Sequence, residues 1–131
     1  MRDNQEENLV SESINWSATA TVAGGPVISG NGKTVADGYD KFEVLLPAGG
    51  SKTLSVAPGN WGDLQLLLIS PAKADPALTY DSGSGDTPLA GPLFLIGGDA
   101  TALLGNGAAT LTLKNGTAAD VGVDILVARS N

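Results

Sequence analysis

The feature that most constrains this chain is an internal repeat, because the pattern that begins at Gly50 recurs from Gly107 to Ile125 at an offset of 57 residues. Each copy has a short strand pattern, a glycine turn and then a longer apolar strand pattern. Five residues are identical: Gly50, Thr53, Leu54, Gly59 and Asp63 recur as Gly107, Thr110, Leu111, Gly116 and Asp120. A catalytic loop rarely repeats in this way. The repeat therefore predicts a structural hairpin that one sheet system uses twice.

The composition of the chain favours an all-β domain built from short strands. Its 131 residues are enough for one domain with a core of its own. Glycine is frequent, with 18 residues, yet 42% of the residues are hydrophobic and only 16% are charged. Disordered chains lack apolar residues, so these glycines indicate tight turns between strands.

Charge and missing residue types exclude several classes of function. The net charge is −7 and the seven basic residues are scattered, so we expect binding neither to nucleic acid nor to an anionic membrane. The absence of cysteine and histidine removes thiol chemistry, the commonest general base and the commonest zinc ligand. We therefore predict no enzyme, no cofactor and no metal site. The opening residues MRDNQEENLV contain no apolar segment, so we expect no secretory signal and synthesis in a cytoplasm.

The chain divides into an acidic N-terminal arm, residues 1–13, and a β-sandwich domain, residues 14–131. The arm is either a frayed terminus or a segment that orders against a neighbouring subunit, with Leu9 and Val10 as its anchor. From Ile14 to Val22 apolar and polar residues alternate, which predicts a half-buried strand with Trp16 facing the core.

Further strand patterns complete the predicted domain. Gly30-Asn31-Gly32 is predicted to be a turn, and Tyr39 to Leu46 a strand with Phe42, Val44 and Leu46 inward. Leu64 to Ser70 is apolar on both faces and should be a central strand, whereas Leu78 to Asp81 should be an edge strand. Asp99 is expected to cap a helical turn that ends at Leu104. Val121 to Val127 alternates cleanly and is predicted to be a strand. About eight strands at this spacing predict a β-sandwich or jelly roll with an extended N-terminal arm.

Three motifs resemble functional sites, and in each the simpler interpretation is favoured. Gly30 to Thr34 lacks the first glycine and the helix of a phosphate loop, so it is interpreted as a turn. The loop from Asp81 to Asp86 has oxygen ligands but too few carboxylates for calcium. Asp40 and Glu43 lie at opposite parity on one strand, so they should not converge as a catalytic pair.

Aromatic residues are the remaining candidates for contact with a partner or ligand. Trp61 lies in a Gly-Asn-Trp-Gly turn and is the best single candidate for an exposed contact residue, with Tyr80 as the second. Packing of Trp61 over the end of the sandwich remains the alternative. Asp63 and Asp120 hold equivalent positions and are expected to accept hydrogen bonds from backbone N–H groups of the preceding turns.

Three features of the sequence stand out together: the acidic arm, the Gly-, Ala- and Thr-rich strands and the closing segment VGVDILVARSN. In these features the chain resembles small phage virion proteins, particularly head decoration or cement proteins. The resemblance implies a symmetric homo-oligomer, such as a trimer, that binds a larger shell such as a major capsid protein and resides in the virion. The leading hypothesis is therefore a non-enzymatic structural protein. The alternative is a carbohydrate- or ligand-binding β-sandwich module that uses Trp61, Tyr80 and the loop Ser82 to Pro88. A third hypothesis is an enzyme that relies on carboxylates alone.

Overall fold

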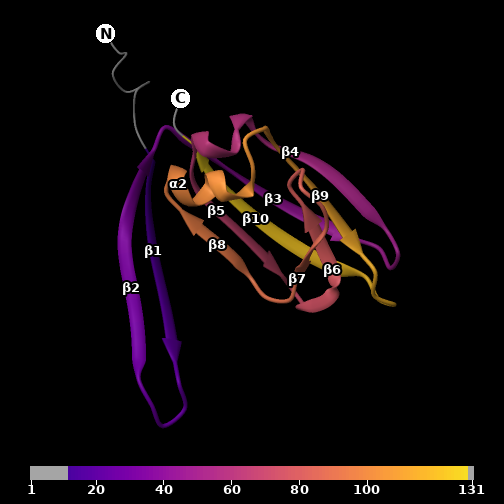
Figure 1. Ribbon diagram of the computed structural model, residues 1–131, viewed down its shortest axis with the longest axis horizontal. Helices are drawn as coiled ribbons and strands as arrows, with labels where there is room; N and C mark the ends of the chain where they lie inside the picture. The colour runs from indigo at the N-terminus through magenta and orange to yellow at the C-terminus, as the bar shows by residue number, and fades with distance from the viewer. Residues whose placement is uncertain (1–11, 130–131) are drawn as a thin grey trace.

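The computed structural model describes residues 12–129, which form a projecting β-hairpin and a body of two four-stranded sheets (Figure 1). The hairpin consists of β1 (Glu12–Thr21) and β2 (Val27–Ala36). One sheet of the body has the order β3 (Gly38–Leu46), β10 (Val121–Arg129), β5 (Leu64–Pro71) and β8 (Leu93–Ile96). The other has the order β4 (Ser51–Asn60), β9 (Ala108–Asn115), β6 (Asp75–Asp81) and β7 (Thr87–Leu89). The predicted all-β class is confirmed.

Three short helical segments complete the body at one end. They are η1 (Trp61–Asp63), α2 (Gly98–Thr101) and η2 (Ala102–Leu104). The predicted helical turn before Leu104 is present, but Gly97 rather than Asp99 stands at its N-cap. Gly97 has a φ of 94°, a conformation that glycine adopts without the steric cost of a Cβ.

The main core lies between the two sheets and is formed by residues of both. Alternation predicts its inward side chains well: Phe42 is half-buried, and Val44 and Leu46 are buried. The core residues of β10 also alternate as predicted; they are Val121, Val123, Ile125 and Val127. The central position predicted for β5 is confirmed, because β5 lies between β10 and β8 and its opposite faces join two different apolar clusters.

The two repeat copies occupy equivalent places, although neither is a hairpin. β4 of the first copy pairs with β9 of the second, and β5 pairs with β10. In one sheet, Leu54 lies opposite Leu111, which is its own equivalent in the second copy. In the other sheet, Leu68 pairs with Leu126 and Ile69 pairs with Ile125, and the 57-residue offset converts each of these pairs into the other. A local two-fold axis therefore passes through both sheets. Each copy crosses the core from one sheet to the other, so the predicted hairpin is wrong.

Several other local predictions are also corrected. β1 begins at Glu12, inside the predicted arm, and β2 continues through the predicted turn at Gly30-Asn31-Gly32. β6 lies between β9 and β7, so it is not an edge strand. Strict alternation along β5 predicts that Leu64 and Leu66 share one face. Leu64 instead lies in the main core together with Leu67 and Ile69, because the β5–β10 register shifts between Ala128 and Arg129.

Candidate interaction surface

Trp61 does not reach the protein surface. Its side chain is 0% exposed within the main core, and its Nε1 donates a hydrogen bond of 3.2 Å to the carbonyl oxygen of Ser82. The prediction that Trp61 is an exposed residue is therefore wrong, and the alternative of inward packing is confirmed. Burial of the large apolar indole in the core stabilises the folded state by more than the conformational entropy of the flanking glycines costs when the turn is ordered.

The other predicted contact residues are Tyr80, Leu9 and Val10, and none of them forms an exposed aromatic site in the part of the chain that the structure describes. Tyr80 is half-buried and packs against the main core. Leu9 and Val10 lie outside the described residues.

The loop that follows β6 is held by its own carboxylate. Asp81 Oδ1 accepts hydrogen bonds from the backbone N–H groups of Gly83, at 2.7 Å, and Gly85, at 3.1 Å. These bonds, that of Gly83 first, lower the pKa of Asp81 below its usual value of 3.8. Asp86 lies 3.0 Å from Lys114 in an ion pair. Among residues 12–129 no group of three His, Cys, Asp or Glu side chains could hold a metal ion.

Acidic side chains elsewhere are also engaged locally. Asp40 pairs with Arg129 at 2.6 Å, and Glu43 pairs with Lys41 at 3.1 Å. The hydrogen bond with Glu43 is the main cause that raises the pKa of Lys41. The Asp63 prediction is confirmed, because its Oδ2 accepts from Asn60 N–H at 3.0 Å.

Asp120 also accepts a hydrogen bond from a backbone N–H group, but the donor is not in the preceding turn. Ala48 donates this bond at 3.1 Å from 72 residues away. The two aspartates at equivalent repeat positions therefore stabilise different turns.

The base of the hairpin packs on the outer face of the sheet β3-β10-β5-β8. Trp16 meets Phe94 edge to face, with ring centroids 6.3 Å apart and planes at 76°. Ile14 joins a second apolar cluster that includes Leu66 and Ala128. Trp16 therefore packs outside the main core, contrary to the prediction, and attaches the hairpin to the body.

Two glycines of β2 make room for this tryptophan. A Cβ on Gly32 would lie 2.8 Å from Trp16 Cζ2, and one on Gly30 would lie 3.7 Å from Trp16 Cζ3. The Gly30-Asn31-Gly32 segment is thus a strand over which the indole packs. It has neither the turn predicted from the sequence nor the helix that a phosphate loop requires.

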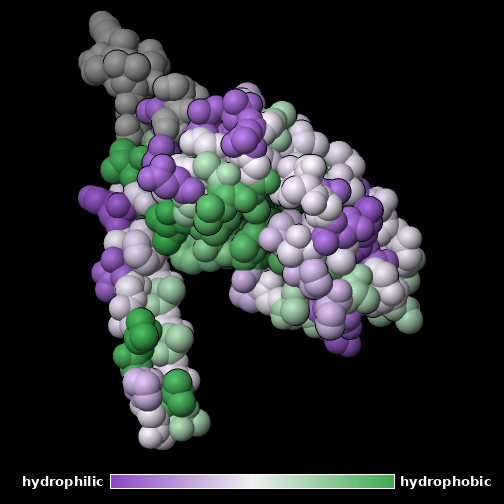
Figure 2. Space-filling view, in the orientation of Figure 1, coloured by the Kyte–Doolittle hydropathy of each residue, from purple (hydrophilic) through white to green (hydrophobic). Residues whose placement is uncertain are grey.

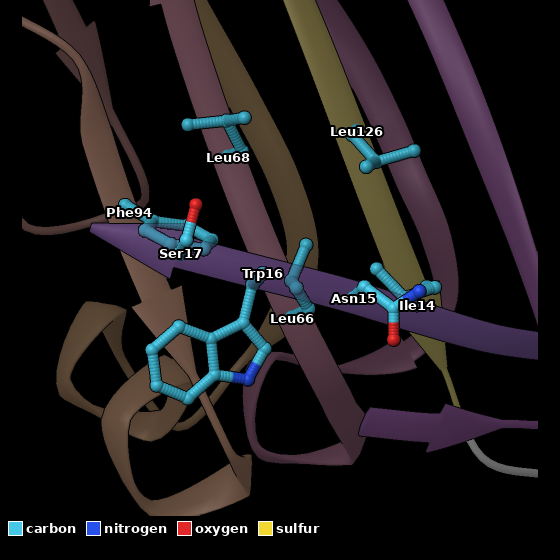
Figure 3. A pocket seen from close by; sticks show the side chains of 8 residues that line it. All are labelled: Ile14, Asn15, Trp16, Ser17, Leu66, Leu68, Phe94 and Leu126. Atoms are coloured by element: carbon cyan, nitrogen blue, oxygen red, sulfur yellow. The ribbon is translucent and has the colours of Figure 1, made fainter. Parts of the chain in front are cut away.

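A groove runs beside β1 on the outer face of the sheet. It has two adjoining hollows of about 270 and 410 Å³, which share Ile14, Asn15 and Leu126. The hairpin side of both hollows consists of β1 residues, Glu12 to Ser17, with no residue of β2. Figure 3 shows Leu68 and Leu126 on one side of β1 and the Trp16 indole on the other. The apolar surface beside the hairpin is visible in Figure 2. The groove therefore has an apolar floor and a strand edge as its wall.

The distal part of the hairpin extends away from the body and has no core of its own (Figure 1). Val22, Val27 and Ile28 are 60%, 59% and 76% exposed. No charged residue occurs from Ser13 to Gly32. This neutral run was the sequence signal for the surface, but from the alternation of Ile14 to Val22 we predicted a half-buried strand with Trp16 facing the core. Here we define residues 12–36 as the hairpin and the two hollows as the β1 groove.

Comparison with known proteins identifies no relative, because no family model, no curated protein and no solved structure matches the chain significantly. Within residues 12–129 the structure contains no helix that is both long enough and apolar enough to cross a membrane.

Proposed function

We propose that this protein is a non-enzymatic structural protein that associates with copies of itself and with a larger protein shell, of the kind that decorates a phage capsid. The observation that carries the proposal is the hairpin, an exposed pair of strands that extends from the body and carries no charged residue from Ser13 to Gly32. An isolated two-stranded hairpin is only marginally stable in water, so a projecting one gains stability when a partner covers it.

The strand order supports the proposal by analogy of fold. The sheet orders β3-β10-β5-β8 and β4-β9-β6-β7 are those of an eight-stranded jelly roll. We infer that the body belongs to this architecture, which capsid proteins and lectins both use. Fold alone does not separate these two functions, so the choice depends on the surface.

The surface favours assembly over carbohydrate binding. Sugar-binding modules stack aromatic rings on their ligands, but Trp61 is fully buried and Tyr80 packs against the main core. The hollow beside the loop at Ser82 is instead lined by small and polar residues, including Thr110 and Thr112. The alternative function therefore loses the aromatic residue on which it chiefly depended.

The proposal is tested by mass in solution and by location. Sedimentation velocity on the full chain from about 1 to 100 µM should give a species heavier than the 13.1 kDa of one chain. Mass spectrometry of virus particles purified from the source of the gene should detect the protein as a particle component. A monomer at every concentration, together with its absence from such particles, would refute the proposal. Specific binding on a glycan array would favour the alternative.

A further inference from the structure

We propose that a second copy of this chain binds in the β1 groove by pairing its own β1 antiparallel to the first, so that two hairpins form one four-stranded sheet. This inference rests on the proposed function and names the surface through which the chains associate. Because the same strand pairs antiparallel with itself, the contact is two-fold symmetric.

The first argument is the free edge of β1. Among the described residues, β1 is hydrogen-bonded to β2 alone, so its other edge presents backbone N–H and C=O groups. Four consecutive residues, Ile14 to Ser17, line the hollow of about 270 Å³ together with Leu66, Leu68, Phe94 and Leu126. A strand in this groove would pair with that edge and place alternate side chains on the apolar floor.

The second argument is charge. Exposed edge strands are usually protected by charged residues, yet Ser13 to Gly32 contains none. The whole chain carries a net charge of −7, so most contacts between two copies would place acidic surfaces together. A neutral strand that pairs with itself avoids this repulsion, so the charge distribution allows a second copy to occupy the groove at this strand.

The third argument is the match of side-chain sizes. If the two-fold axis passes through Ala18, then Ala20 of the second copy lies opposite Trp16, and its Val22 lies opposite Ile14. Large side chains thus face small or medium ones. Ala20 and Val22 are exposed within one chain and would then cover Leu68, Phe94 and Leu126 of the other. Pairing from residue 14 to residue 22 joins the copies along roughly 30 Å of strand.

Charge substitutions on the full-length protein test this pairing. Ala20→Asp should raise the dissociation constant of the dimer by at least about 100-fold, because the carboxylate would be buried against the apolar floor of the second copy. Ser29→Asp is the matched control, since Ser29 is an exposed residue of β2 on the opposite face of the hairpin. Circular dichroism should show that both variants fold, because both positions are exposed in a single chain.

A complementation experiment tests the register. Ala18→Lys and Ala18→Asp should each weaken the dimer by at least about tenfold, because like charges would meet at the two-fold axis. An equimolar mixture of the two variants should restore a species of twice the mass. Three results would overturn the pairing while the proposed function stands. They are a wild-type oligomer that the Ala20→Asp substitution leaves intact, a wild-type oligomer that contains three chains, and an equimolar mixture of the two Ala18 variants that stays monomeric. A wild-type monomer that is still found in virus particles would also overturn the pairing alone.

Discussion

The side chain of Asn115 provides the most direct test of how the body is held together. It is 2% exposed at the end of β9, and its Nδ2 donates to the carbonyl oxygens of Leu46 at 3.0 Å and Pro47 at 3.2 Å. The same amide nitrogen donates to Ala119 O at 2.8 Å. Its Oδ1 accepts from Thr117 N at 2.9 Å and from Thr117 Oγ1 at 2.6 Å. One amide thus links the end of β3 to the loop that leads into β10.

Asn115→Ala should lower the free energy of unfolding by about 3 kcal/mol. A buried hydrogen bond contributes roughly 1 kcal/mol net, and water can replace part of the bonds because only the one to Leu46 is fully buried. For a chain of this length the melting temperature should fall by roughly 10 °C. Urea unfolding followed by circular dichroism measures the change. The matched control is Asn106→Ala, an exposed asparagine that should change stability by less than about 0.5 kcal/mol.

Asn115→Asp adds a test of the electrostatics. A carboxylate would face three carbonyl oxygens, so burial and repulsion should raise the pKa of the introduced group above its value in the unfolded chain. The destabilisation should therefore be fully present at pH 7 and smaller at pH 4, where the group is largely protonated. The reasoning fails if Asn115→Ala costs no more than Asn106→Ala, or if Asn115→Asp is equally destabilised at both pH values.

Four further outcomes are expected. Gly32→Ala should displace the Trp16 indole, because the new Cβ would lie 2.8 Å from Cζ2; in a Trp61→Phe background the remaining tryptophan emission should shift to the red, and an unchanged spectrum would contradict the contact. Leu66→Asp should abolish the native circular dichroism spectrum, since it puts a charge where the side chain is 1% exposed; a cooperative unfolding transition in this variant would count against the packing. The carboxyl of Asp81 should titrate below its usual pKa of 3.8 when followed by NMR, and a midpoint above 3.8 would be inconsistent with the hydrogen bonds from Gly83 and Gly85. Because the pKa is lowered in the folded state, the stability that this carboxylate supplies is present at neutral pH and disappears as the pH falls through the folded pKa. The dimer proposed above should keep its mass between low and high salt in sedimentation, since the paired strands carry no charge from Ser13 to Gly32, whereas dissociation by salt would point to ion pairs instead.

Local alternation predicted the strands of the body because it reports which side chains face an apolar surface. Val121 to Val127 and Phe42 to Leu46 follow a period of two, and their inward residues are those of the main core. The same signal could not say which surface a strand faces. Trp16 therefore has the expected parity but packs on the outer face of a sheet, against Phe94.

The repeat shows the same division between pattern and partner. Its glycines recur for different reasons, since Gly59 has a φ of 89° while a Cβ on Gly116 would lie 2.9 Å from Ala77 O. Its aspartates also differ, because Asp63 accepts a bond within its turn and Asp120 accepts one from distant Ala48. Identical letters at equivalent positions did not predict identical contacts.

Sequence alone determined the β class, the inward faces of the main strands and the absence of charge from Ser13 to Gly32, because each of these depends on the order of side chains along the chain. Tertiary structure decided that each repeat copy crosses between sheets, that Trp61 is buried and that residues 12–36 project as a hairpin beside an apolar groove. The physical reason is that strand pairing and burial depend on which distant segments meet, and local periodicity carries no information about those partners.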